Sequence, residues 1–229
     1  MNNVGGEIAQ HGLTQWWESL TSREQNLLIT NYNPTYVNAF GGHVLVEGKL
    51  GKKSHDIPAD FLMTLSSWLH KSDDEEKQLA IKLANYAWEL RDVTEPVVAS
   101  RATLSRHYAL GRMCEFFYVL RDDPVYFERS VECARLQIEM EAKTRRALKR
   151  EFGSRTSITI ERMRTAGEWD PGVFTLPIHH GYKRMAIVLE KEKRYGEALE
   201  VIREARRKGW DGDWDKREER IRKRLSKTK

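Results

Sequence analysis

One stretch of this sequence, residues 179–210, constrains the fold more than any other. Its apolar and small residues recur three and four positions apart, first from Tyr182 to Leu189 and then from Ala198 to Ala205. Such spacing gives each half one apolar face, so it predicts two amphipathic helices. The polar run at 193–196 predicts the turn between them, and Gly209 stands where a left-handed helix end favours glycine. We therefore expect an antiparallel helix pair in this stretch.

The same stretch resembles a tetratricopeptide repeat, a helix–turn–helix unit of about 34 residues. Tyr182 stands where that family usually has tryptophan, and Trp210 stands where it has a closing proline. The resemblance implies an all-α fold, a TPR-like right-handed array of antiparallel helix pairs. The positions that match the family's small and large residues are Ala186, Leu189, Tyr195, Ala198, Ile202 and Ala205.

Apolar stripes and capping residues predict helices along most of the remaining chain. Thr21 with Glu24 forms a capping-box sequence, and Asp73 and Asp123 precede two further helical patterns. A helix is expected from about Thr94 to Arg121, and the helix after Pro124 is expected to continue to about Arg150. The apolar stripes include Trp16, Trp17, Leu20, Leu28, Phe61, Leu65, Leu79, Ala80, Leu83, Ala84, Ala87, Leu104, Cys114 and Phe117.

We expect one TPR-like helical domain over residues 1–229. Residues 43–48 favour a short strand, so a short irregular or β-hairpin insertion is expected near 35–55. Turn-forming residues interrupt any regular pattern in 152–177, and the sequence leaves open whether either segment is ordered. The expected parts are N-terminal helices with the irregular segment (13–57), degenerate helix pairs (58–150), a long connection (151–178), the best repeat (179–210) and a capping helix (211–229).

The composition is that of a folded chain with an uneven charge distribution. Hydrophobic residues make up 40% and charged residues 32%, and no run approaches the roughly 18 apolar residues of a membrane span. The first residues show no signal-peptide pattern, so a cytoplasmic protein without membrane contact is expected. Residues 1–100 carry 8 Lys and Arg against 13 Asp and Glu, whereas 101–229 carry 31 against 21. This asymmetry can reflect an acidic or nucleic-acid partner for the basic half, but in helical proteins it more often reflects solvated helix faces.

No motif for cofactor or metal chemistry is present in the sequence. Cys114 and Cys133 lack a cysteine at metal-binding spacing, so they predict buried free thiols. The acidic run that begins at Asp211 has Lys216 at the sixth position and Arg222 at the twelfth, where a calcium loop requires glycine and glutamate. The run therefore predicts helix capping instead. Neither a phosphate-binding glycine loop nor a nucleophile elbow occurs. We therefore expect a non-enzymatic protein without a cofactor.

The resemblance implies a peptide-binding groove along the first helices of the array. Its groove positions fall on His180, Lys183, Arg184 and Ile187, and the Ser105–Phe116 helix would add Tyr108 and Arg112. Members of the family that bind carboxylates use Lys and Arg where Lys183 and Arg184 stand. The resulting hypothesis is a scaffold that holds a protein or peptide partner with an acidic segment or C-terminal carboxylate.

Three alternatives stay open beside that hypothesis. Lys183 and Arg184 are also explained, and more simply, as solvated residues on a helix surface. The basic tail from Lys216 to Lys229 could follow nucleic-acid phosphates, although Glu218 and Glu219 interrupt it. An unrecognised enzyme is the third alternative, because a folded active site need not follow sequence order. The sequence does not define the partner, the biological process or the oligomeric state.

Overall fold

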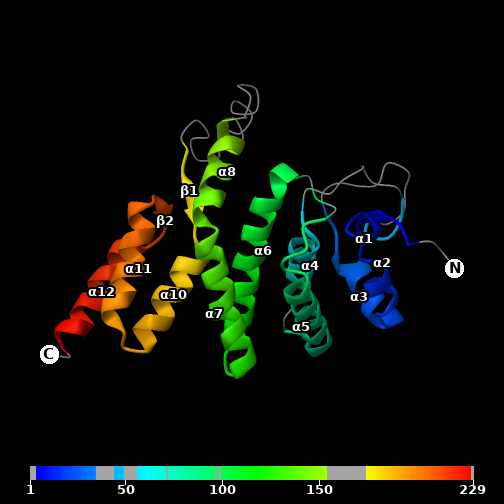
Figure 1. Ribbon diagram of the computed structural model, residues 1–229. Coiled ribbons are helices and arrows are strands. Elements are labelled where there is room, and N and C mark those ends of the chain that lie inside the picture. The colour runs from blue at the N-terminus through cyan, green and yellow to red at the C-terminus, as the bar shows by residue number, and fades with distance from the viewer. Residues whose placement is uncertain are drawn as a thin grey trace. The chain divides into compact units, whose positions relative to one another are not determined.

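The computed structural model describes residues 4–34, 44–48, 56–70, 72–95, 97, 99–153 and 174–227. The predicted all-α class is confirmed, since helices dominate these ranges and the strands among them are two short segments (Figure 1). The chain divides into two compact units, Met1–Met113 and Cys114–Lys229. None of the helices in the described ranges combines the length and the apolar character that crossing a membrane requires.

Two helices of the first unit begin at the capping residues from which the sequence predicts a helix start. Thr21 accepts a hydrogen bond from the Glu24 amide while the Glu24 carboxylate accepts from the Thr21 amide, which completes the capping box. Asp73 caps the next predicted helix through the Glu76 amide. The elements are α1 (Gly6–Gln10), α2 (Thr14–Glu18), α3 (Ser22–Asn31), α4 (Pro58–Ser67), α5 (Asp74–Glu89) and the first part of α6 (Ala99–Val119).

Aromatic contacts join the helices of the first unit. The ring of His11 stacks on Phe61 with centroids 4.0 Å apart, and Trp16 stacks on Tyr86 at 5.8 Å. The pair α4 and α5 packs closely through the alanine-rich face of α5, where small side chains let the backbones approach. The fully buried residues of that face are Ala80, Leu83, Ala84 and Ala87.

The strand predicted at 43–48 is wrong for the residues described there, because 44–48 form a turn. The first N–H groups of a helix have no acceptor within the helix, so another segment must supply one. The carbonyl groups of this turn do so for α1, and they are therefore not free to pair in a sheet. The hydrogen bonds run from Gly5 to Val46, Gly6 to Gly48, Glu7 to Val44 and Ile8 to Leu45. The other residues of the predicted insertion lie outside the described ranges.

A buried polar contact ties α4 to α6 within the first unit. The Asp60 carboxylate, with its side chain 3% exposed, accepts hydrogen bonds from Ser105 Oγ at 2.9 Å and from Arg112 Nη1 at 2.7 Å. The Ser105 hydroxyl also accepts the Ile57 N–H at 2.8 Å, at the start of α4. Burial raises the pKa of Asp60 to about 7, although the Arg112 charge acts in the opposite direction.

This contact should make the first unit more stable as the pH falls from about 8 to about 5. The pKa of Asp60 is about 7 in the folded chain against an ordinary value of 3.8, so folding favours the protonated form. The contribution is complete below about pH 4 and is lost as the pH rises through about 7. One pKa unit is worth about 1.4 kcal/mol, so we expect a gain of at least that order. Hydrogen exchange of α4 and α6 amides at the two pH values, corrected for intrinsic rates, measures it.

Asp60→Asn is the matched variant for this pH effect. Asparagine keeps the shape of the side chain and its ability to accept from Ser105, but it does not titrate. The variant should therefore lose the part of the pH dependence that Asp60 contributes to α4. The opposite contribution of His11, whose pKa is lowered by burial against Phe61, should be the same in both proteins. An unchanged dependence in the variant would assign the effect to another group.

The second unit contains the end of α6 and the remaining elements. Asp123 caps α7 through the Val125 amide, as predicted. The expected single helix from Pro124 to Arg150 is wrong, because it is interrupted at Met140. Glu141 begins the next helix with its side chain turned into the interior, so tertiary contacts override the continuous helical pattern. The elements are α7 (Pro124–Glu139), α8 (Glu141–Gly153), β1 (Leu176–Ile178), α10 (His180–Lys191), α11 (Tyr195–Arg207), β2 (Trp210–Asp211) and α12 (Trp214–Ser226).

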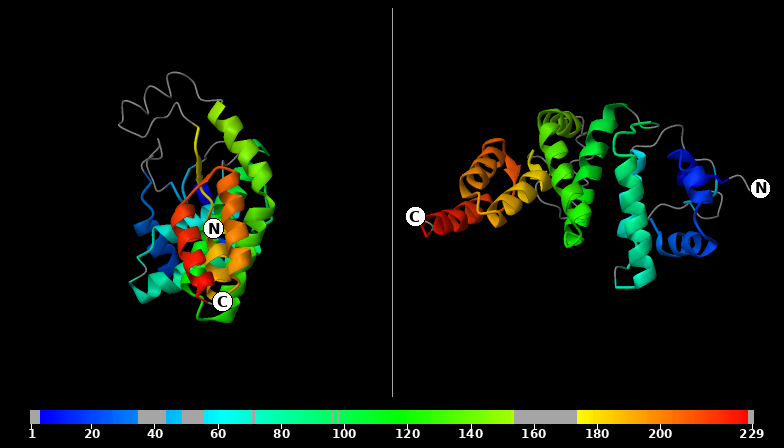
Figure 2. Two further views of the ribbon diagram at one scale, coloured as in Figure 1. Left: turned by 90° about the vertical axis from the view of Figure 1, so that its left-hand side faces the viewer. Right: turned by 60° about the horizontal axis from the view of Figure 1, so that its bottom comes forward.

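The predicted helix pair at 179–210 is confirmed as α10 and α11. They pack closely on each other, α10 also packs on α7, and α11 also packs on α12 (Figure 1, Figure 2). Lys193 in the turn and Gly209 after α11 both have a positive φ, as the turn and the helix end require. The small residues Ala186, Ala198 and Ala205 are all buried between the helices. Their burial explains how the pair can approach closely.

Gly181 shows how closely α10 approaches α7. A Cβ atom added to Gly181 would lie 2.7 Å from the carbonyl oxygen of Ala134, which is too close for any side chain. The Gly181 amide donates to the side-chain oxygen of Gln137 across the same contact. The close approach at this glycine could not be predicted from the sequence, because Gly181 lies within a regular helical pattern.

A polar network closes the end of the helix pair. The Glu141 carboxylate, with its side chain 2% exposed, pairs with Lys208 Nζ at 3.0 Å and accepts from Trp210 Nε1 at 3.2 Å. Lys208 also donates to the Tyr182 hydroxyl at 2.8 Å. The backbone of Trp210 forms the short parallel pair of β2 with β1, in which Leu176 lies opposite Trp210. These contacts explain why a tryptophan occupies the position after α11.

The two cysteines are both buried, as predicted. The Ser130 hydroxyl donates to the carbonyl oxygen of Cys114 at 2.8 Å, which links α7 to the end of α6. Burial raises the pKa of the Cys114 thiol to about 11, so the thiol stays protonated near neutral pH.

Candidate functional site

One side of α10 carries three of the predicted binding residues, and they meet at one carboxylate. Glu115, from the end of α6, lies 3.0 Å from Arg184 Nη2, 3.4 Å from His180 Nδ1 and 3.8 Å from Lys183 Nζ. Residues 180, 183 and 184 share one helix face because they are three and four positions apart. The sequence therefore placed the cations correctly on one face, but it did not identify Glu115 as their common partner.

Arg184 is held more firmly than its two neighbours. Its side chain is 4% exposed, and its guanidinium lies 3.4 Å from the centre of the Tyr118 ring. The His180 and Lys183 side chains are 42% and 33% exposed. A guanidinium can stack on an aromatic face while it also binds a carboxylate. Arg184 is thus a buried part of the site, whereas the His180 and Lys183 side chains are exposed enough to contact a ligand.

The environment of Glu115 keeps this carboxylate ionised. Burial acts to raise its pKa, but contact with His180 and the charges of Arg184 and Lys183 lower it to about 2. Its contribution to stability is present above the unfolded-state pKa of about 4.5 and is lost as the pH falls towards 2. At neutral pH, the ionised Glu115 therefore forms ion pairs with Arg184 and Lys183 and also contacts His180.

A second carboxylate, that of Glu190 on α10, binds arginine side chains from α12. Glu190, with its side chain 8% exposed, accepts from Arg220 Nε at 2.9 Å and Nη2 at 2.6 Å. Arg224 Nη1 lies 3.1 Å from the same carboxylate. This geometry is the bidentate pairing that fixes the plane of a guanidinium. Glu190 therefore holds two arginines in place between α10 and α12.

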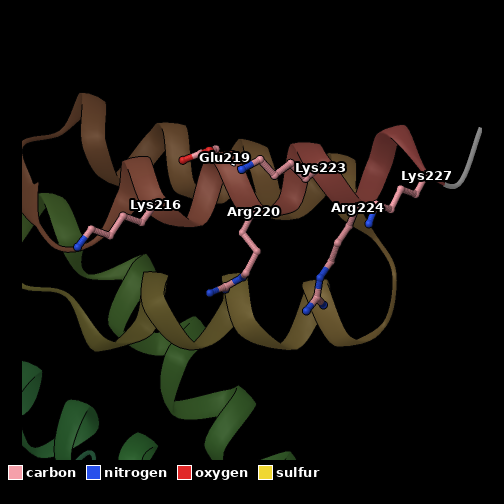
Figure 3. Close-up of a pocket in the computed structure, with 6 residues that line it drawn as sticks. All are labelled: Lys216, Glu219, Arg220, Lys223, Arg224 and Lys227. Atoms are coloured by element: carbon pink, nitrogen blue, oxygen red, sulfur yellow. Dashed lines mark hydrogen bonds and ion pairs between the residues drawn. The ribbon is translucent and has the colours of Figure 1, made fainter.

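The arginines on α12 line a depression of about 280 Å³. Figure 3 shows Arg220 and Arg224 pointing towards α10, with Lys216 and Lys227 at the two ends of the row. The row follows helical spacing, so one face of α12 presents it. The lining side chains are Lys216, Glu219, Arg220, Lys223, Arg224 and Lys227, which are five cations and one carboxylate.

Ile187 lies between these two groups of charges. It is three residues from Arg184 and from Glu190 on α10, so helical geometry places it on the face between them. It is half-buried. Ile187 therefore offers an apolar surface between Glu115 with its cations and the depression on α12.

Tyr108 and Arg112, the other predicted residues, lie on the part of α6 in the first unit. Arg112 is engaged by Asp60, while Tyr108 is 37% exposed. The structure brings His180, Lys183, Arg184 and Ile187 onto one helix face. Reasoning from sequence missed Glu115, Glu190 and the α12 arginines as parts of the same surface. The one sequence signal for the α12 arginines is the basic run after Trp214, and by itself this run predicts only a capping helix or a phosphate-binding tail.

Comparison of this chain with family models, with curated proteins and with solved structures gave no match.

Proposed function

We propose that this protein is a non-enzymatic interaction scaffold whose second unit binds an acidic peptide segment across α10 and α12. The observation that carries this proposal is the depression on α12, where five of the six lining side chains are Lys or Arg. Excess positive charge in a hollow favours an anionic ligand, because the walls focus the field. The resemblance to tetratricopeptide repeats supports the same face, since α10 corresponds to the first helix of the repeat.

The distribution of internal ion pairs indicates which cations would meet the partner. Arg184 is buried against Glu115, and Arg220 is bound to Glu190. Lys216 and Lys227, by contrast, form no ion pair with any residue in the described ranges. The two lysines and the exposed Lys183 would therefore supply new contacts, while the arginines provide a fixed positive background.

Charge reversal at the two ends of the depression tests the proposal. We expect Lys216→Glu/Lys227→Glu to weaken binding of a fluorescein-labelled peptide of alternating Glu and Ser, about twelve residues long, by at least about tenfold. Fluorescence anisotropy at low and at physiological salt measures the affinity. A peptide of alternating Lys and Ser serves as the ligand control.

Lys143→Glu/Arg207→Glu is the matched protein control, because it changes the net charge equally at exposed positions on α8 and α11. It should bind the acidic peptide nearly as the unmodified protein does. If both double variants weakened peptide binding equally, the loss would be explained by the change in net charge alone. That result would contradict a defined binding site. Tighter binding of a mixed-sequence oligonucleotide, with a steep dependence on salt, would instead support the nucleic-acid alternative.

A further inference from the structure

The depression on α12 carries more positive charge than one carboxylate can neutralise. Its lining side chains have five positive charges and one negative charge. Glu190 adds a second negative charge from α10, through its ion pairs with Arg220 and Arg224. Three positive charges then remain around a hollow of about 280 Å³. A ligand group that carries two negative charges would match this surplus better than a single carboxylate.

The donors on Arg220 point to the same kind of group. A guanidinium has five N–H donors in a fixed planar fork. Glu190 engages the Nε and Nη2 atoms of Arg220, so this carboxylate sets the plane of the group and leaves Nη1 for a ligand. Lys216, Lys223 and Lys227 line the same hollow, with Lys216 and Lys227 at its two ends and the Lys223 ammonium 2.6 Å from Glu219 (Figure 3). Arg220 has Lys216 one turn before it and Arg224 one turn after it, so an acceptor with three oxygen atoms can contact this Nη1 and a neighbouring cation together.

We infer that the depression binds a phosphate monoester, so that the acidic partner is a peptide carrying phosphoserine or phosphothreonine. This inference rests on the proposed function and names the ligand group at the same site. A phosphorylated side chain carries close to two negative charges at neutral pH and three strong acceptor oxygens. Arginine forks and lysines are the side chains that recognise such groups.

The lining of the depression favours a peptide over a nucleic acid as the source of the phosphate. Proteins that bind single strands without sequence preference combine a basic groove with aromatic side chains on which bases stack. Among the residues that the structure describes, no aromatic side chain lines this depression, and Trp214 on the same helix is buried. Glu219 within the row would also repel a continuous run of phosphates. A single phosphate flanked by peptide is compatible with both features.

The second ionisation of the phosphate, with a pKa of about 6, provides the test. Three labelled peptides that differ only at the central residue, as phosphoserine, glutamate or serine, are compared by anisotropy at pH 5.5 and 7.5. We expect the phosphoserine peptide to bind about tenfold tighter than the glutamate peptide at pH 7.5 and to lose most of this advantage at pH 5.5.

The glutamate peptide also controls for titration of the protein. The groups that face Arg220 are Glu190 from α10, Asp213 at the start of α12, and Lys216, Glu219, Lys223, Arg224 and Lys227 from α12. Side chains of these types ordinarily titrate outside the range from about pH 5.5 to 7.5. A pH-dependent change in the protein would alter the binding of both peptides, so only the difference between them reports the phosphate.

Arg220→Lys/Arg224→Lys tests the arginine forks without removing charge opposite Glu190. It should reduce the preference for phosphoserine over glutamate to less than about threefold. Arg203→Lys/Arg222→Lys is the matched control, since both of these arginines bind Glu218 outside the depression. That variant should keep the full preference. Circular dichroism establishes that each variant is folded. A Lys216→Ala variant tests the same preference for phosphoserine and removes no ion pair among the described residues.

The possible failures are distinct from one another. If phosphoserine and glutamate peptides bind equally at both pH values, the phosphate inference is wrong while the proposed function stands. If neither acidic peptide binds, the proposed function is wrong. If an oligonucleotide competes better than the phosphopeptide, the phosphate belongs to a nucleic acid and the inference is overturned. Competition by free orthophosphate at the same concentration as the phosphopeptide would show that the peptide adds nothing.

Discussion

Replacing Glu141 with alanine is expected to destabilise the second unit by about 3–5 kcal/mol, the range for breaking a buried ion pair. The Glu141 side chain is 2% exposed and receives Lys208, Arg145 and the Trp210 indole N–H. Burial acts to raise the pKa of Glu141, but hydrogen bonds from Lys208 and Trp210 lower it overall. Its removal leaves a half-buried ammonium and a buried indole donor without their common acceptor. Both losses add to the cost.

Glu204→Ala is the matched control for this prediction. Glu204 also pairs with Lys208, at 2.7 Å, but its side chain is 41% exposed. Exposed ion pairs on a helix are worth less than about 1 kcal/mol. Urea unfolding followed by tryptophan fluorescence, together with hydrogen exchange in α10 and α11, measures both variants. Equal effects of the two substitutions would show that burial of Glu141 does not determine its contribution.

Tyr182→Ala is expected to cost a similar amount, about 3–5 kcal/mol, because it removes a fully buried aromatic ring. The ring lies in the core cluster of α10, α11 and α12, and its centroid is 4.6 Å from that of His179. Its hydroxyl accepts from Lys208 on the far side of the cluster. Alanine would leave a cavity that the closely packed alanines around it cannot fill. Chemical denaturation with the same probes measures the loss.

Tyr182→Phe separates the ring from its hydroxyl. Phenylalanine keeps the packing and loses only the bond to Lys208, so we expect a cost of about 1–2 kcal/mol. This cost should not vary with pH near neutrality, because burial raises the pKa of Tyr182 above its ordinary value of 10 and the hydroxyl stays protonated. A Phe variant as unstable as the Ala variant would place the importance of Tyr182 in the hydrogen bond.

The parts of the fold that depend on short-range signals were predictable from the sequence. Thr21, Asp73 and Asp123 cap the helices that they were expected to cap. Ala198 and Ala205 are buried because helical periodicity places both on the face that meets α10. In each case the residues that decide the structure lie within one or two turns of each other.

The failures involve partners that are distant in sequence. The turn at 44–48 pairs with α1. The predicted long helix is interrupted at Met140, and the buried Glu141 that follows contacts Lys208 and Trp210. The same limit applies to the candidate site. A pattern on α10 predicted where Lys183 and Arg184 would point, but not that Glu115 from α6 would meet them. Long-range ion pairs of this kind leave no periodic trace in the sequence.

The carboxylates Glu115 and Glu190 have a consequence for how readily the α10 and α12 face can bind. Long cationic side chains lose rotational freedom when a ligand orders them, at about 0.5–1.5 kcal/mol for each chain. Glu115 and Glu190 already hold Arg184, Arg220 and Arg224 in single positions before any partner arrives. Most of this entropy is thus lost during folding. A partner would have to order only the lysines, so even a short anionic segment could bind with useful affinity.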